Sequence, residues 1–586
     1  MTVSPGAKPE SSAPPARSVF AALAVFAERR TLVMLVLGFS AGLPFLLVFD
    51  TLSAWLRDAG LTLEVIGFFS LATLVYSFKF LWAPLIDRAA VPLLTNWLGH
   101  RRSWMLVCQA LIMLGLWLIA GSDPAANLAL MAAFAIMVGF ASATQDIAID
   151  AWRIEAAELS KQGAMAAAYQ WGYRIAMIVA GAAPLLLAEV YTWNFSYAVM
   201  AALMGIGMLA VLAAPREAPH KPRPIPTAGI GAAPALESME WAARMLVLAL
   251  GALLLGSGLA ANASALSRLL GGAGLETAGA AIAAAWSSDY SVWFQLLSVV
   301  CGFAVIVVAT LPVPGMRTRP GLYLSAALGD PLRDFFRRYR GMAGLILALI
   351  CFYRLSDFVL NIMNPFYLDL GYTLTEVAEV RKIFGVVASV LGIFAGGFAV
   401  ARLGLIRAMV IGAFASPLSN IFFIWLALQG HDLFALFAAI GVDNALGGFA
   451  GTCLIAYMSS LTGKGFTATQ YALFSSLYAL PGRLIASQSG RIVEGAAVSA
   501  DAGGAFSVFS GLFANMPAES FAQAIEKSGV SPAALGSGYI AFFSYSVAIG
   551  VLAVVLAFAV AARQEKAMTE AKAADTAVPS AAPTRP

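Results

Sequence analysis

Apolar stretches of about twenty residues recur along almost the whole chain, and they constrain its fold more than any other feature. A bilayer core about 30 Å thick needs about 20 mostly apolar residues per helix, and a spanning segment must satisfy its backbone hydrogen bonds internally. We therefore expect fourteen transmembrane helices, at residues 31–52, 65–86, 104–121, 127–150, 164–188, 195–213, 242–261, 291–313, 342–368, 382–401, 406–428, 433–459, 468–490 and 538–562.

The composition supports residence in a bilayer and excludes several functions. Of the 586 residues, 60% are hydrophobic and only 12% are charged, whereas a soluble domain has roughly 25% charged residues. A net charge of +4 is too small for a nucleic-acid surface, so we expect no nucleic-acid partner. The four cysteines stand singly and the three histidines lie in polar connections, so the sequence predicts no metal site, no cofactor and no enzyme.

Lys and Arg residues are concentrated in alternate connections between the expected helices. Short loops rich in these residues stay on the cytoplasmic side of a membrane. We therefore expect both termini in the cytoplasm, as an even number of spans requires.

The chain repeats itself, which indicates two similar halves. The string DAGLTL at Asp58–Leu63 returns as DLGYTL at Asp369–Leu374. A repeat in the same sense predicts two six-helix bundles related by an axis along the membrane normal, as in two-halved secondary transporters. We expect a disordered cytoplasmic tail at 1–30, an N-terminal bundle at 31–213, cytoplasmic linkers with two inserted helices at 214–341, a C-terminal bundle at 342–562 with an external loop at 491–537, and a disordered cytoplasmic tail at 563–586.

Seven ionisable residues fall inside expected spans, where each would oppose insertion by about 2.5–3.5 kcal/mol if it faced lipid. They either form structural ion pairs between helices or line a transport path. These residues are Lys79, Asp146, Arg174, Arg354, Asp357, Asp443 and Arg483.

Helical spacing groups these charges with other polar residues into candidate binding faces. Residues at intervals of three and four lie on one side of a helix. On span 342–368 the candidate substrate-binding residues are Arg354, Asp357, Asn361 and Asn364. On span 164–188 they are Tyr169, Gln170, Tyr173 and Arg174, and Lys79 of span 65–86 is added to the set.

Asp146 and Asp150 are neighbours at positions i and i+4, and we expect them to couple transport to protons. Two carboxylates this close repel each other, which favours protonation of one of them. Alternatively, Asp150 lies at the cytoplasmic end of its helix and pairs with Arg153 or Lys161.

Charges in two corresponding loops predict a gating latch, an ion pair that forms when one side of a transporter closes. The first loop carries Asp87, Arg88, Arg101 and Arg102. Its counterpart in the second half carries Arg402 and Arg407.

Several strings make the chain resemble the AmpG-type muropeptide permeases of the major facilitator superfamily. They are FKFLWAPLIDR at 78–88, SATQDIAIDAW at 142–152, GYR at 172–174 and FTATQYAL at 466–473. The resemblance implies a fourteen-helix permease of the bacterial inner membrane that imports anhydromuropeptides, with N-acetylglucosamine and anhydro-N-acetylmuramic acid, for cell-wall recycling by proton symport.

The resemblance and the residues combine into one hypothesis. Sugar rings would stack on Tyr169, Trp171, Tyr173 or Trp152, and Arg174 and Arg354 would hold the substrate carboxylates. The alternatives are a permease for another anionic or sugar-like solute, such as acyl-coenzyme A, and a membrane sensor that transports nothing.

Overall fold

The protein is an all-helical bundle in the part of the chain that the structure describes, which confirms the expected fold class. The computed structural model describes residues 24–576 apart from 49, 60–73, 125, 218–224, 226–229, 231–232, 260–261, 289, 314–317, 357–361, 464, 487–488, 515, 518 and 523. Helices and turns account for the described residues, and no strand occurs among them.

The helices of the first half pack mainly on one another. In chain order they are η1 (Val25–Ala27), α2 (Arg29–Val48), α3 (Asp50–Asp58), α5 (Leu74–Phe78), η3 (Lys79–Leu81), α6 (Ala83–Arg88), α7 (Leu94–Leu98), α8 (His100–Ala120), α9 (Leu128–Ala156), η4 (Leu159–Lys161), α10 (Gln162–Val190) and α11 (Trp193–Ala213).

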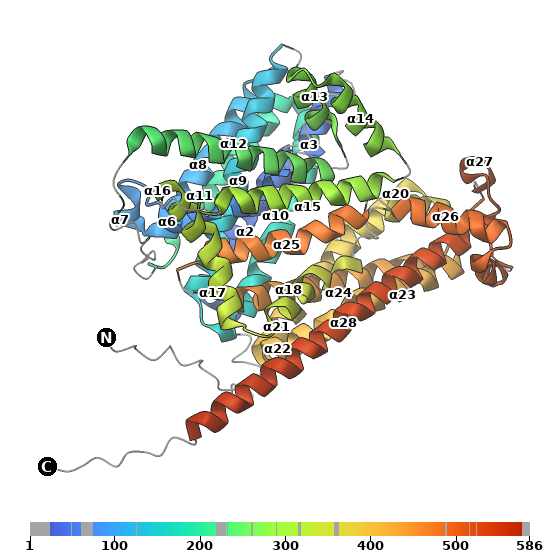
Figure 1. The fold of residues 1–586 in the computed structure, drawn as a ribbon. Coiled ribbons are helices and arrows are strands. Elements are labelled where there is room, and N and C mark those ends of the chain that lie inside the picture. The colour runs from blue at the N-terminus through green and yellow to red at the C-terminus, as the bar shows by residue number, and fades with distance from the viewer. Residues whose placement is uncertain are drawn as a thin grey trace.

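Two long helices between the halves, α12 and α15, lie side by side (Figure 1). Gly251, Gly258 and Gly302 let their backbones approach closely, because a Cβ atom at each would meet the other helix. The elements of this region are α12 (Pro234–Leu259), α13 (Ser264–Gly272), α14 (Glu276–Ser287), α15 (Ser291–Thr310), α16 (Arg319–Leu324), η5 (Ser325–Gly329) and α17 (Asp330–Arg338).

The second half ends in the long helix α28, which runs diagonally along the lower side of the molecule in Figure 1. Its elements are α18 (Ala343–Phe352), α19 (Met363–Asp369), α20 (Leu374–Glu379), η7 (Val380–Phe384), α21 (Gly385–Leu403), α22 (Leu405–Ala413), α23 (Ala415–Gln429), α24 (Leu433–Ser460), α25 (Thr467–Ala486), α26 (Ser489–Asp501), η8 (Ala505–Phe513), α27 (Ala524–Ser528) and α28 (Pro532–Thr576).

Within the described residues, 11 helices are long and apolar enough to cross a membrane, or 12 if the bent pair α26 and η8 forms one span. They coincide with eleven of the fourteen expected spans. Of the other three, spans 65–86 and 342–368 lie partly outside the described residues and are broken into short helices elsewhere. The third, span 468–490, corresponds to α25, which carries polar residues such as Thr469 and Gln470.

The region 491–537, expected to be an external loop, contains α26, η8, α27 and the first turn of α28. These elements pack on α28, and Phe521 contacts the rings of Phe513 and Tyr539. Helix α28 continues to Thr576, beyond residue 562, where we expected the terminal tail to begin.

Glycines bring helix backbones into direct contact in both halves. A Cβ atom at Gly38 of α2 or Gly172 of α10 would collide with the backbone of the other helix. Gly392 of α21 and Gly448 of α24 pack in the same way in the second half. These pairs of helices have no room for side chains where they cross.

Hydrogen bonds connect the two halves at several levels. One joins the ends of α9 and α24, and others join α10 to α21 and α24. Arg153 donates to the hydroxyl of Ser459 at 2.8 Å, and the Trp171 indole donates to the carbonyl of Val390 at 2.9 Å. Close to mid-helix, the Gln170 amide donates to the hydroxyl of Thr452 at 2.5 Å.

Candidate functional site

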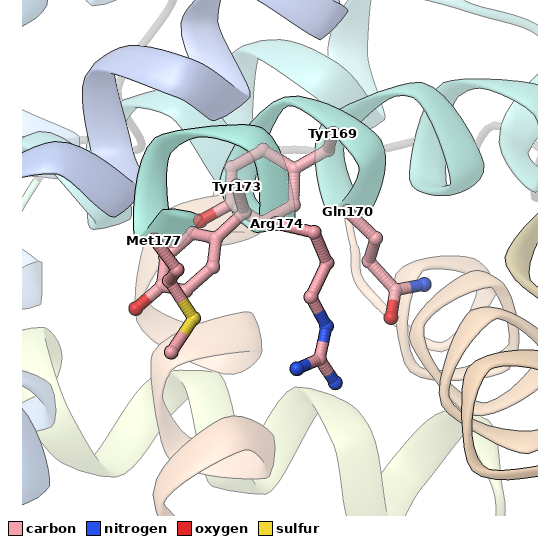
Figure 2. Close-up of a pocket in the computed structure, with 5 residues that line it drawn as sticks. All are labelled: Tyr169, Gln170, Tyr173, Arg174 and Met177. Carbon is pink, nitrogen blue, oxygen red and sulfur yellow. The ribbon is translucent and has the colours of Figure 1, made fainter. Parts of the chain in front are cut away.

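One face of α10 lines a cavity of about 260 Å³. Figure 2 shows its lining side chains, with Gln170 and Arg174 extending the same way from the helix. Helical spacing explains the face, because residues at i, i+4 and i+8 lie on one side. The lining residues are Tyr169, Gln170, Tyr173, Arg174 and Met177.

The opposite face of α10 fixes this wall in position. Gly172 packs against the backbone of α2 at Leu35 and Phe39, so α10 cannot rotate about its axis without a clash. The tyrosines therefore project from a rigid support, which favours a binding site with a defined shape.

The second half supplies charges facing this wall. Arg174 lies within electrostatic range of both Arg354 and Asp443. The Gln170 amide oxygen and the Arg354 guanidinium converge over Gly451 of α24, each within 3.3 Å of the position that a Cβ atom would take there. The site thus combines two guanidinium groups with aromatic rings, which suits an anionic ligand with ring systems.

The expected polar stripe of span 342–368 does not lie on one continuous helix. Helix α18 ends at Phe352, Arg354 follows in a turn, and α19 begins only at Met363. Pro365 lies in the first turn of α19, where a proline is tolerated because its missing N–H group would have no partner within the helix. Asn364 is exposed and accepts a hydrogen bond from Arg381, and it is not among the residues that line the cavity.

Three residues expected at the site, Asp357, Asn361 and Arg483, belong to the part of the chain whose side chains are not described. Two tryptophans expected to stack on sugar rings lie elsewhere. Trp152 is buried in the core, and Trp171 stacks on Phe394 between the halves.

A group of buried charges lies behind the tyrosine wall. Lys79 approaches a carboxylate oxygen of Asp150 at 4.0 Å, and Arg153 contacts the other oxygen at 3.2 Å. Asp146, one turn away on α9, interacts electrostatically with Lys79, Asp150 and Tyr169, and its Oδ1 is buried without a hydrogen-bond partner. Lys161, considered as a partner of Asp150, pairs with Glu28 at 2.8 Å instead.

Two of the expected latch residues, Asp87 and Arg101, meet at the ends of α6 and α8. The Arg101 guanidinium donates to Asp87 at 2.7 Å and to Glu155 at 2.9 Å, and its side chain is fully buried. Asp87 also accepts hydrogen bonds from the backbone N–H groups of Ala468 and Thr469, at 3.2 and 2.8 Å, which begin α25. One carboxylate therefore connects the two halves.

Arg102 has a different role from Arg101. Its guanidinium donates to the carbonyls of Val211 and Leu212, at the end of α11, at 2.9 and 3.0 Å. The remaining expected latch residues lie at the ends of α6, α21 and α22. Arg88 is partly buried at the end of α6, and Arg402 and Arg407 are exposed around the turn between α21 and α22.

Glu217 caps the start of α8 and was not expected from the sequence. Its carboxylate accepts from the backbone N–H groups of Arg101 and Arg102 at 2.9 and 3.0 Å. Gly99 has a φ of 99° and leaves space for this carboxylate, with which a Cβ atom would collide. Burial raises the pKa of Glu217, and the two backbone hydrogen bonds oppose this increase.

A second group missed by sequence reasoning surrounds Gln470 in the first turns of α25. Its amide oxygen accepts from Arg338 at 3.0 Å and from the backbone of Gly463 at 2.6 Å. Its amide nitrogen donates to the carbonyl of Pro331 at 2.7 Å and to Asp334 at 3.3 Å. No spacing rule in the sequence links residue 470 to α17.

Among the described residues, no group of three or more His, Cys, Asp or Glu side chains is arranged to hold a metal ion.

Comparisons with known proteins agree with this architecture. The family model of the Major Facilitator Superfamily matches residues 78–356. The chain is 30% identical over 475 residues to the anhydromuropeptide permease of Escherichia coli, covering 80% of this chain and 76% of that protein. It is 28% identical over 473 residues to a Rickettsia felis protein that carries the name AmpG 4, covering 80% and 91% of the two chains.

Solved structures include the proton:xylose symporter XylE, at 11% identity and a TM-score of 0.49, with coverage of 92% and 94%. The human organic anion transporter TETRAN is 15% identical with a TM-score of 0.44, and covers 92% of this chain and 100% of its own. The helices long enough to span a bilayer make the protein a multi-pass membrane protein. On its similarity to the Escherichia coli permease, the chain belongs to the AmpG-type muropeptide permease family of the Major Facilitator Superfamily, a family of transporters.

Proposed function

We propose that this protein imports anhydromuropeptides across the bacterial inner membrane, in symport with protons. The observation that carries the proposal is the α10 wall, where two tyrosines and Arg174 line one cavity, in a chain 30% identical to the Escherichia coli anhydromuropeptide permease. Such a substrate combines sugar rings with the free carboxylates of a peptide stem, so it needs both kinds of contact.

The substrate occupies the space between α10 and the second half. Its sugar rings pack on Tyr169 and Tyr173, and Arg174 and Arg354 bind its carboxylates by charge-assisted hydrogen bonds. The cavity, at about 260 Å³, is slightly smaller than the roughly 300–1,000 Å³ typical of ligand pockets. We therefore assign it to one part of the substrate, with the remainder extending out of it.

Proton coupling is assigned to Asp146. Its electrostatic contacts with Tyr169 and with the Lys79–Asp150 pair support this assignment, because protonation of Asp146 would change the balance of charge behind the wall that holds the substrate. Asp150, one turn away, pairs with Arg153 and Lys79 and completes the proposed coupling site.

The contacts between the halves indicate which side of the proposed path is closed. Asp87, Arg153 and Gln170 connect the halves from the latch side to mid-helix. With the latch in the cytoplasm, as the distribution of Lys and Arg residues predicts, this conformation receives substrate from outside. Release of the latch then opens the path to the cytoplasm.

Uptake into proteoliposomes under an imposed pH gradient tests the proposal. We expect radiolabelled anhydromuropeptide to accumulate only when the outside is acidic, and replacement of Na⁺ by K⁺ to leave uptake unchanged. Asp146→Asn should abolish the dependence on pH. Accumulation of acyl-coenzyme A but not of muropeptide would contradict the proposed substrate. No accumulation of any solute would contradict the proposal that the protein is a transporter.

A further inference from the structure

Helix α24 presents bare backbone to the Arg354 guanidinium at two positions one turn apart, Gly447 and Gly451. Gly448 between them faces the other way and packs on Ser389 of α21. Gly447 and Gly451 therefore do not serve this helix contact.

The two glycines are not equivalent. A Cβ atom at Gly447 would lie 3.6 Å from Nη2 of Arg354, which is an ordinary van der Waals distance. At Gly451 it would lie 3.2 Å from Oε1 of Gln170 and 3.3 Å from Nη1 of Arg354. These two contacts come from opposite halves of the protein.

We propose that Gly451 determines specificity for substrates with a free carboxylate, by leaving the space in which Arg354 and Gln170 approach each other across the boundary between the halves. The inference rests on the proposed function. It adds a residue that is separate from the expected latch residues.

The physical reason is the position of the guanidinium. Arg354 and Arg174 belong to different halves, and the Arg354 guanidinium lies against the backbone of α24. We expect Arg354 to reach a carboxylate bound at Arg174 only from this position. A methyl group at residue 451 pushes both the guanidinium and the Gln170 amide away. Both contacts are ends of flexible side chains, so we expect the fold to tolerate the change while the geometry of binding does not.

Calorimetric binding to the purified full-length protein tests this. The probes are N-acetylglucosaminyl-anhydro-N-acetylmuramyl tripeptide and the same compound with its stem carboxyls amidated. We expect Gly451→Ala to weaken binding of the charged probe about tenfold, which is typical of a lost hydrogen bond to a charged group, and to leave binding of the amidated probe unchanged. Gly447→Ala should have a smaller effect, and Gly344→Ala, where no atom lies within 4 Å, should have none.

A double-mutant cycle separates the proposed role from general damage to the helix. In an Arg354→Ala background, Gly451→Ala should change the affinity no further. A wild-type protein that binds neither probe would overturn the proposed function itself. Wild-type binding together with an unaffected Gly451→Ala variant, or an equal additional loss in the Arg354→Ala background, would overturn the role of Gly451 alone.

Discussion

The Asp87 carboxylate accepts hydrogen bonds from the backbone N–H of Thr469 at 2.8 Å and from its hydroxyl at 2.6 Å, although 382 positions separate the two residues. The carboxylate lies at the N-terminus of α25, where the helix dipole favours negative charge. Its other oxygen is held by Arg101 at 2.7 Å. One side chain thus connects a helix end of the second half to a buried cation of the first.

Asp87→Asn should reduce uptake at least about tenfold at equal expression, because each hydrogen bond to a charged group is worth roughly 1.5–3 kcal/mol. An amide presents N–H groups to the donors of α25 and leaves Arg101 with Glu155 as its remaining carboxylate partner. Thr469→Ser keeps the hydroxyl and should remain close to wild type. Normal uptake by Asp87→Asn would show that closing the latch does not depend on this charge.

Gln470→Leu should lower the free energy of unfolding by on the order of 2–4 kcal/mol, because it leaves several buried groups around α17 without partners. Gln564→Leu is the matched control, since Gln564 donates one hydrogen bond, to the Tyr457 hydroxyl. We expect that control to cost less than about 1 kcal/mol. Thermal unfolding in detergent measures both, and equal losses would contradict the prediction.

Arg174→Ala should reduce uptake of anhydromuropeptide by about 100-fold if this guanidinium binds a substrate carboxylate. Arg174→Lys should recover only part of the loss, because a lysine cannot form a bidentate pair. Arg268→Ala, at an exposed position on α13, controls for loss of positive charge. An effect of Arg268→Ala as large as that of Arg174→Ala would point to the overall charge of the protein.

The contribution of Glu376 to the stability of the fold should depend on pH. The backbone N–H of Thr373 first, and then the Thr373 hydroxyl and His431, hold the pKa of this carboxyl below its usual value of 4.5. A carboxyl with a lowered pKa stabilises the fold above its ordinary pKa, and that contribution is lost as the pH falls through the lowered value. Wild type should therefore exceed Glu376→Gln in stability at pH 7, and the difference should shrink below about pH 4.

Thermal unfolding of both proteins between pH 7 and pH 3 would detect this change. Because glutamine can also complete the capping box at the start of α20, we expect only a small difference at pH 7, which reflects the lost charge. A difference that grows on acidification would contradict the assignment.

The sequence predicted the helices whose apolar runs are uninterrupted, because the thickness of the bilayer sets one length for them all. It did not locate the end of α18 at Phe352, because an average over about 20 residues does not show where a helix stops within them. The helices of 491–537 also escaped detection, because short helices that pack on a neighbour need no apolar run of membrane length.

For the candidate site, helical spacing was sufficient to place Tyr173 and Arg174 on one face of α10, because both belong to one regular helix. The partners of Asp87 are harder to predict. Arg101 lies nearby in sequence, but Ala468 and Thr469 each contribute a backbone N–H group, and any residue type except proline offers one. Contacts of this kind leave no trace in composition or spacing.

The glycine crossings between α2 and α10 and between α21 and α24 restrict where the protein can bend. Helices whose main chains touch can neither slide nor separate without opening a void, so each pair must move as one rigid body. Conformational change is therefore confined to the interface between these rigid bodies, where side chains can exchange partners. Larger residues at Gly172 or Gly392 should consequently lower the yield of folded protein and leave the preference of the surviving molecules for inward or outward opening unaltered.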